Sequence, residues 1–126
     1  MDFELARRNM VDNQVRTNRV TDPLVIAALR AIPREVFVPA AQKGVAYLDD
    51  DIPVAPGRYL MEPMVLARLL QLADVQTGDA VLDVGCATGY STAVLAKMAS
   101  SVVALEEDPA MVAWATETLL GLGVDN

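Results

Sequence analysis

The stretch that decides the fold is Asp83-Val84-Gly85-Cys86-Ala87-Thr88-Gly89-Tyr90. It overlaps the end of Ala80–Val84, a short and nearly all-apolar segment that is typical of a strand covered on both faces. Gly85 and Gly89 can adopt positive φ and leave room for a ligand beside the backbone. The helix expected over Tyr90–Met98 directs unpaired N–H groups toward the same place. Turns of this kind also occur for packing reasons, so plain turn chemistry stays open as an alternative.

A second unit of the same kind follows the first. Ser101–Leu105 is another apolar segment of strand length, and the pattern after it predicts a helix over Ala110–Leu120. Strand–helix–strand–helix at this spacing predicts an α/β fold with parallel strands and right-handed crossovers. Val124 has the character of an entrance to a third strand. Because two strands cannot cover the helices packed on them, we expect the chain to be a fragment, truncated after the second β–α unit.

The residues before Pro63 have a helical and then an irregular pattern. Apolar residues at loose helical spacing predict one amphipathic helix from Phe3 to Val15. Asp22-Pro23 is an N-cap and first-turn signal for a second helix, through Leu24–Ala31. The N-terminal part therefore begins with two helices.

Prolines at positions 39, 53 and 56 interrupt the chain after these helices. They predict extended or turning backbone, with one short helix near Ala40–Tyr47. A new helix starts at Glu62-Pro63 and ends near Asp74. We therefore divide the chain into an N-terminal helical and irregular extension, residues 1–62, and the first part of an α/β domain, residues 63–126.

Composition excludes several classes of function. The 126 residues include no histidine and one cysteine, so triads that need histidine and zinc sites that need imidazole or four cysteines are excluded. We expect no metal site. A formal net charge of -7 argues against nucleic acid as the partner. No apolar run approaches the roughly 20 residues of a membrane span and no signal peptide is visible, so we expect a cytoplasmic protein without membrane contact.

The spacing of the glycines separates two classes of cofactor. A dinucleotide fingerprint that starts at Gly85 needs glycine where this chain has Ala87 and Tyr90, so a nicotinamide cofactor fits poorly. Asp-x-Gly-x-Ala-x-Gly instead resembles the first motif of Rossmann-like S-adenosylmethionine methyltransferases. Glu106 ends the second strand, where a carboxylate can accept hydrogen bonds from both hydroxyls of a ribose. We therefore expect S-adenosyl-L-methionine as the cofactor, bound by Asp83, Gly85, Cys86, Ala87, Gly89 and Glu106.

Two of these residues have a simpler interpretation as well. Asp83 could cap N–H groups of the loop, or it could contact the amino-acid end of the cofactor directly or through water. Cys86 is expected to be a small loop residue rather than a nucleophile, because no basic residue lies nearby in the sequence to lower its pKa.

Five stretches of the chain carry a family pattern: Met10–Arg16, Ile32–Pro39 with its Pro-Arg-Glu-x-Phe-Val-Pro motif, Ala46-Tyr47, Val81–Tyr90 and Val102–Glu106. With these stretches, nearly the whole chain resembles the N-terminal part of the protein-L-isoaspartate O-methyltransferase family. The resemblance implies a mostly parallel, Rossmann-like sheet flanked by helices, with the N-terminal extension on the substrate side. It also implies methyl transfer to isoaspartyl residues of proteins or peptides, which is a repair activity.

One motif departs from the family pattern. Where the family carries Gly-Gln-Thr-Ile-Ser-x-Pro, this chain has Gly57-Arg58-Tyr59-Leu60-Met61-Glu62-Pro63. The hydroxyl residues that line the family's methyl-transfer site therefore fall on Tyr59 and Met61, and Met61 cannot donate a hydroxyl hydrogen bond. Arg58 could instead bind an anionic acceptor through its charge. We take Arg58, Tyr59 and Met61 as the candidate catalytic positions and Leu60 as a cofactor contact. The alternative is a plain loop with Tyr59 and Met61 packed inward.

The expected reaction does not need the histidines that the chain lacks. An isoaspartyl carboxylate is already anionic at pH 7, so methyl transfer depends on orientation rather than on a general base. We therefore expect a methyltransferase of the resembled family. Two alternatives stay open. One is a protein that binds S-adenosylmethionine but has lost the isoaspartyl acceptor site, and the other is a structural fragment too incomplete to bind or catalyse.

Overall fold

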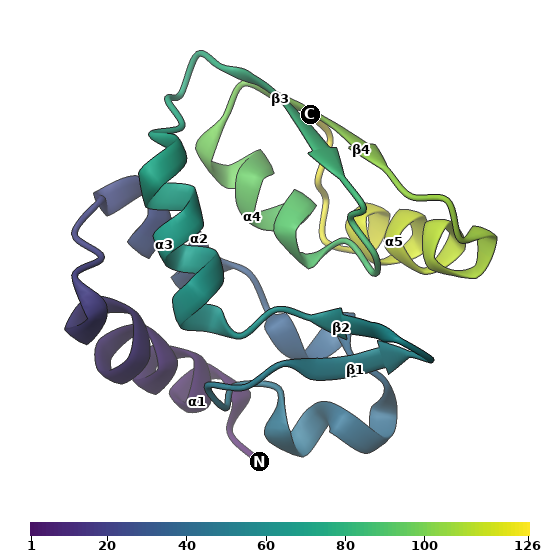
Figure 1. The fold of residues 1–126 in the computed structure, drawn as a ribbon, viewed down its shortest axis with the longest axis horizontal. Coiled ribbons are helices and arrows are strands. Elements are labelled where there is room, and N and C mark those ends of the chain that lie inside the picture. Colours follow the sequence, from purple (N-terminus) through teal and green to yellow (C-terminus); the bar gives the residue numbers. More distant parts are fainter.

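The computed structural model describes all residues from Met1 to Asn126 (Figure 1). The α-helices are α1 (Phe3–Met10), α2 (Pro23–Ala31), α3 (Pro63–Ala73), α4 (Tyr90–Met98) and α5 (Pro109–Gly121). The strands are β1 (Ile52–Ala55), β2 (Arg58–Leu60), β3 (Ala80–Val84) and β4 (Ser101–Leu105). Short helical turns are η1 (Val11–Val15), η2 (Arg16–Asn18), η3 (Arg34–Phe37) and η4 (Ala40–Val45). No helix combines the length and the apolar character that crossing a membrane requires.

The helix starts follow the capping signals of the sequence. The side chain of Asp22 accepts the N–H of Leu24 at the start of α2, and Pro23 occupies the first turn. The chain is helical from Phe3 to Val15 as predicted, but only α1 is an α-helix, because the backbone widens to the π-helical segment η1 from Val11 onward. The backbone then reverses at a left-handed residue, Arg19.

The segment expected to be irregular contains a hairpin that the sequence analysis missed. Strands β1 and β2 pair antiparallel, with Ile52 opposite Leu60. Pro56-Gly57 forms the turn between them, with Gly57 at φ +71, which suits the third position of a type II turn. The same Pro and Gly that break a helix therefore close a hairpin here. This correction matters because β2 carries Arg58 and Tyr59.

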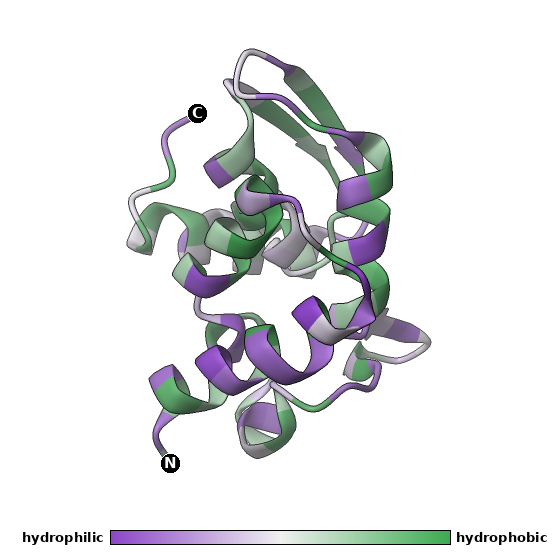
Figure 2. Cartoon of the chain, turned by 90° about the vertical axis from the view of Figure 1, so that its left-hand side faces the viewer, coloured by the Kyte–Doolittle hydropathy of each residue, from purple (hydrophilic) through white to green (hydrophobic).

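Strands β3 and β4 pair parallel and in register, from Ala80 opposite Ser101 to Val84 opposite Leu105. The predicted α/β unit is confirmed, but the expected coverage of both strand faces is wrong. Helix α4 packs on one face, whereas the large apolar side chains on the other face are exposed; these are Leu82, Val84, Val103 and Leu105. Figure 2 shows the apolar character of the two strands.

The last residues run along the free edge of β4 without forming a strand. The N–H of Val102 donates to the carbonyl of Asn126 at 2.9 Å. Val124, expected at the entrance to a third strand, instead donates its N–H to the carbonyl of Leu119 at 3.0 Å, as part of the turn that closes α5.

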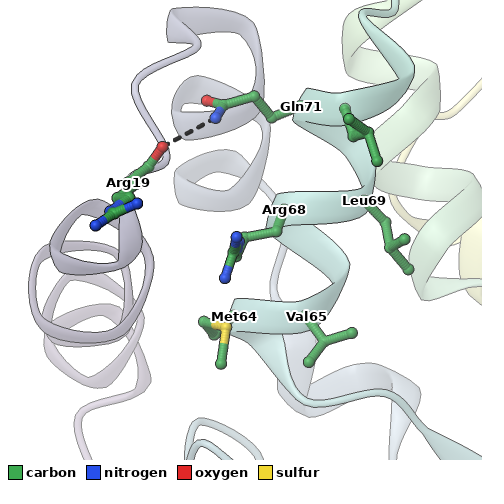
Figure 3. A pocket seen from close by; sticks show the side chains of 7 residues that line it. Arg19, Met64, Val65, Arg68, Leu69 and Gln71 are labelled. Carbon is green, nitrogen blue, oxygen red and sulfur yellow. Dashed lines mark hydrogen bonds between the residues drawn. The ribbon is translucent and has the colours of Figure 1, made fainter.

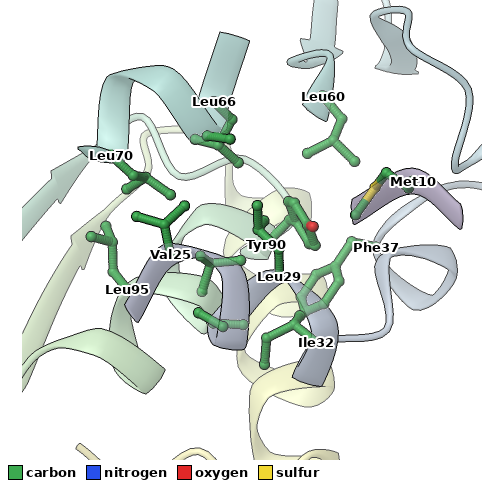
Figure 4. Packing of buried hydrophobic residues seen from close by; sticks show 14 of the residues in the cluster. Met10, Val25, Leu29, Ile32, Phe37, Leu60, Leu66, Leu70, Tyr90 and Leu95 are labelled. Carbon is green, nitrogen blue, oxygen red and sulfur yellow. The ribbon is translucent and has the colours of Figure 1, made fainter. Parts of the chain in front are cut away.

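A single hydrophobic core connects the two parts of the chain (Figure 4). Leu29 from α2, Leu66 from α3 and Tyr90 from α4 meet there. The ring of Tyr90 contacts Phe37 edge to face, with 5.6 Å between ring centres. Residues 1–62 thus pack directly on residues 63–126, and the boundary between them stays a prediction about domains.

Candidate functional site

The glycine loop is docked on the carboxyl end of β4. The N–H groups of Gly85 and Cys86 donate to the carbonyl of Leu105 at 2.8 and 3.0 Å. Gly89, at φ +101, turns the chain into α4, whose first turn has no side-chain cap. The loop and the residue after β4 therefore lie at one edge of the sheet, where ligands bind in open α/β folds.

The two glycines of the loop have different reasons to be glycine. A Cβ at Gly89 would lie 3.1 Å from the Cβ of Ala115, so this glycine allows α4 and α5 to approach closely. A Cβ at Gly85 would meet no atom within 4 Å. Gly85 faces a cavity of about 520 Å³ whose lining also includes Arg58, Val84, Leu105, Glu106 and Glu107. Its φ of +74 by itself favours glycine, and the open side of Gly85 in addition leaves space for a ligand, as a cofactor loop requires.

Ala87 takes the left-handed conformation that glycine adopts most easily. Its φ is +51, although it carries a Cβ. The strained turn directs the N–H of Ala87 to Glu106. Position 87 thus has the glycine-like geometry that the motif requires.

Glu106 follows β4, and its carboxylate is saturated with hydrogen bonds. Oε1 accepts from the N–H of Ala87 and Oε2 from the N–H of Asp108, both at 2.9 Å. The guanidinium of Arg58 donates to Oε1 at 2.5 Å and to Oε2 at 3.1 Å. Arg58, followed by the backbone donors, lowers the pKa of Glu106 to about 2. The stability that this carboxylate contributes is therefore complete above pH ~4.3, its unfolded pKa. It is lost as the pH falls through about 2.

Asp83 and Cys86 belong to the support of the loop. Oδ2 of Asp83 accepts the hydroxyls of Ser91 and Thr92 at 2.7 and 2.8 Å, so it anchors the first turn of α4 rather than N–H groups of the loop. Contact of Asp83 with the cofactor stays a prediction. Cys86 is buried, and burial raises the pKa of its thiol, which agrees with a role in the loop rather than as a nucleophile.

The hairpin brings one of its candidate residues into the site. Arg58 reaches Glu106, whereas Tyr59 and Met61 are exposed to solvent. The alternative in which Tyr59 and Met61 pack inward is therefore wrong. Leu60 alternates to the other side and lies in the core (Figure 4), so its contact with the cofactor stays a prediction.

Arg34 holds the hairpin in place and was not among the candidate residues. It is completely buried, and its guanidinium donates to the carbonyls of Ala46 at 2.5 Å and Met61 at 2.8 Å. It also lies over the ring of Tyr90, 4.9 Å from the centre. Burial lowers the pKa of Arg34, since no carboxylate pairs with it. The signal that could have found it is its position in the Pro-Arg-Glu motif at Pro33.

Thr88 ties the glycine loop to the N-terminal part. Its hydroxyl is buried and donates to the carbonyl of Phe37 at 2.7 Å. Thr88→Val keeps the shape and leaves this carbonyl without a donor, so the free energy of unfolding should fall by about 1–2 kcal/mol. Urea denaturation measures the loss. Thr116→Val is the control, because the Thr116 hydroxyl is exposed and bonds only within α5, to Val112. Equal losses in the two variants would contradict the expected role of Thr88.

A second cavity lies away from this site (Figure 3). It has a volume of about 630 Å³ and lies between Arg19 and one side of α3, with Met64, Arg68 and Leu69 in its lining. Gln71 closes one end by donating to the carbonyl of Arg19 at 2.9 Å. No acidic or nucleophilic side chain lines it, so the chemistry of the molecule gathers at the glycine loop.

Comparison with known proteins shows the family of the chain. The family model described as Protein-L-isoaspartate(D-aspartate) O-methyltransferase (PCMT) matches residues 6–126. Protein-L-isoaspartate O-methyltransferase 1 of Rhodopseudomonas palustris is 36% identical over 124 residues, which are 98% of this chain and 51% of that protein. The chain thus spans about half the length of the curated relatives it matches.

Solved structures share the fold. A protein-L-isoaspartate O-methyltransferase superposes with a TM-score of 0.83 at 23% identity, over 95% of this chain and 40% of the other. A putative protein-L-isoaspartate O-methyltransferase from Plasmodium falciparum, in complex with S-adenosyl-L-homocysteine, gives a TM-score of 0.78 at 21% identity, over 95% and 60%. The fold and the resemblance expected from the motifs are thereby confirmed, and the chain belongs to the protein-L-isoaspartate (D-aspartate) O-methyltransferase family.

Proposed function

We propose that the chain forms the cofactor-binding part of an S-adenosylmethionine-dependent methyltransferase that acts on isoaspartyl carboxylates. The observation that carries the proposal is one cavity, at the carboxyl ends of two parallel strands, lined by both Gly85 and Glu106. Family membership and the S-adenosyl-L-homocysteine complex of the Plasmodium falciparum protein support it. Repair of isoaspartyl proteins in the cytoplasm is the physiological setting that we propose with it.

In this mechanism the residues of the chain bind the cofactor and orient the acceptor carboxylate. Glu106 would accept hydrogen bonds from the ribose hydroxyls, and the open side of Gly85 would leave room for the ligand next to the backbone. When bound, S-adenosylmethionine supplies a methyl group on a positively charged sulfur. The acceptor carboxylate is ionised at pH 7 and needs no general base, so its alignment decides the rate. Arg58, Tyr59 and Met61 are the acceptor-side positions, and Arg58 can donate to an anion.

A second candidate is a protein that binds the cofactor but methylates another acceptor, or none. The observation in its favour is that Tyr59 and Met61 occupy the positions of the family's hydroxyl residues and are exposed. The phenol of Tyr59 is the only side-chain hydroxyl group between Gly57 and Pro63. Cofactor binding alone therefore does not distinguish the two candidates.

Two measurements on the purified chain test the proposal. Titration with S-adenosyl-L-homocysteine in a calorimeter should show binding in the micromolar range, about 10 µM or tighter. Incubation with methyl-labelled S-adenosylmethionine should transfer label to an isoaspartyl peptide and not to the same peptide with normal aspartate. Gly85→Val is the control, because its side chain would enter the cavity, and it should abolish both results. Since valine is strained at the φ of +74 found here, thermal melting must show that this variant is folded.

The outcomes separate the candidates. Binding together with methylation of the isoaspartyl peptide supports the proposed function. Binding without methylation of that peptide favours the second candidate. Absence of binding contradicts both candidates.

A further inference from the structure

Arg58 and Glu106 form a contact that bears on how a ligand enters the site. Arg58 lies on the hairpin strand β2, 48 positions before Glu106, and binds both carboxylate oxygens through its guanidinium. The side chain of Glu106 is only 2% exposed, whereas that of Arg58 is 33% exposed. The carboxylate is thus held inside, and the arginine covers it from the solvent side.

The hydrogen-bond capacity of Glu106 is fully used in this arrangement. A carboxylate has two oxygens with about four lone-pair positions. Two positions accept the N–H groups of Ala87 and Asp108, and two accept the guanidinium. The backbone donors belong to the loop and to the start of α5, so Arg58 is the one donor that a side-chain rotation can remove from Glu106. A ribose that donates two hydroxyl hydrogen bonds to Glu106 needs the positions that Arg58 fills.

We infer that Arg58 occupies the ribose-binding carboxylate of the free protein, and that an S-adenosyl ligand binds by displacing it. The inference rests on the proposed function, because it takes Glu106 as the ribose acceptor. Displacement is sterically open, since Arg58 is partly exposed and borders the same cavity as Gly85. Arg58 then weakens cofactor binding in the free chain.

Removing the competitor should tighten binding. Arg58→Met keeps the length of the side chain without its donors, and S-adenosyl-L-homocysteine should bind about fivefold to twentyfold more tightly than to the parent chain. Arg58→Gln retains one weaker donor group, so its dissociation constant should lie between those of the parent chain and Arg58→Met. Isothermal titration calorimetry measures the three dissociation constants. Thermal melting of each variant shows that it is folded.

Arg68→Gln is the matched control. Arg68 is an exposed arginine of α3 without an ion pair, and it does not line the cavity of Glu106, so this variant removes the same charge outside the site. It should leave the dissociation constant unchanged. If Arg68→Gln tightens binding as much as Arg58→Met, the gain comes from net charge and the inference is overturned.

A pair of nucleosides tests the site of competition. Adenosine should gain affinity in Arg58→Met, whereas 2′,3′-dideoxyadenosine, which has no ribose hydroxyls to place on Glu106, should bind both proteins equally. Unchanged or weaker binding of S-adenosyl-L-homocysteine to Arg58→Met, with binding to the parent chain intact, overturns the inference alone. Absence of binding to every variant contradicts the proposed function, and the inference falls with it.

Discussion

Replacement of Arg34 by alanine should lower the free energy of unfolding by about 3–4 kcal/mol. The side chain is completely buried, so its removal leaves a cavity of the kind that costs several kcal/mol in other cores. It also leaves the carbonyls of Ala46 and Met61 without their donor. Urea denaturation followed by circular dichroism measures the change.

Two further variants separate the parts of this effect. Arg34→Met fills most of the space but donates no hydrogen bond. Its free energy of unfolding should therefore fall by about 2 kcal/mol, which is the part of the effect that comes from the hydrogen bonds. Arg30→Ala is the matched control, since Arg30 makes only a half-exposed ion pair with Asp12 and should cost at most about 0.5 kcal/mol. A loss below about 1 kcal/mol in Arg34→Ala would contradict the role assigned to the buried guanidinium.

Local patterns predicted the second part of the fold well. The strand over Ala80–Val84, the helix over Tyr90–Met98 and the strand over Ser101–Leu105 are all confirmed. Each is signalled by residues adjacent in sequence, because apolar run length and glycine position act over a few residues. Coverage of the strands could not be predicted in this way, since it depends on what packs on each face.

The hairpin and the ion pair were missed for physical reasons. Pro56-Gly57 signals a turn but does not say which segments pair across it, so β1 and β2 read as irregular chain. The contact of Arg58 with Glu106 joins residues 48 apart, and that of Thr88 with Phe37 joins residues 51 apart. Charge alone suggested an anionic partner for Arg58, and only the fold identifies Glu106 as that partner.

Replacement of Glu106 by glutamine should weaken binding of S-adenosyl-L-homocysteine by about 100-fold. Glutamine keeps the size of the side chain, but only its one oxygen can accept hydrogen bonds, because its amide nitrogen is a donor. The two N–H groups from Ala87 and Asp108 then compete for that oxygen with the ribose hydroxyls. Calorimetry measures the dissociation constant, and Glu117→Gln, at an exposed glutamate of α5 that does not line this cavity, is the matched control.

The direction in which ligand affinity changes when Arg58 or Glu106 is replaced distinguishes the possible roles of the ion pair. If Arg58 and Glu106 served stability alone, loss of either partner would loosen the same edge and both variants would bind the ligand less well. If Arg58 competes with the ribose for Glu106, the arginine variant binds more tightly and the glutamine variant binds less tightly. The double variant Arg58→Met/Glu106→Gln should bind as weakly as Glu106→Gln alone, because the competitor has nothing left to block. A gain in affinity from Arg58→Met that persists in the Glu106→Gln background would mean that Arg58 opposes the ligand elsewhere than at this carboxylate.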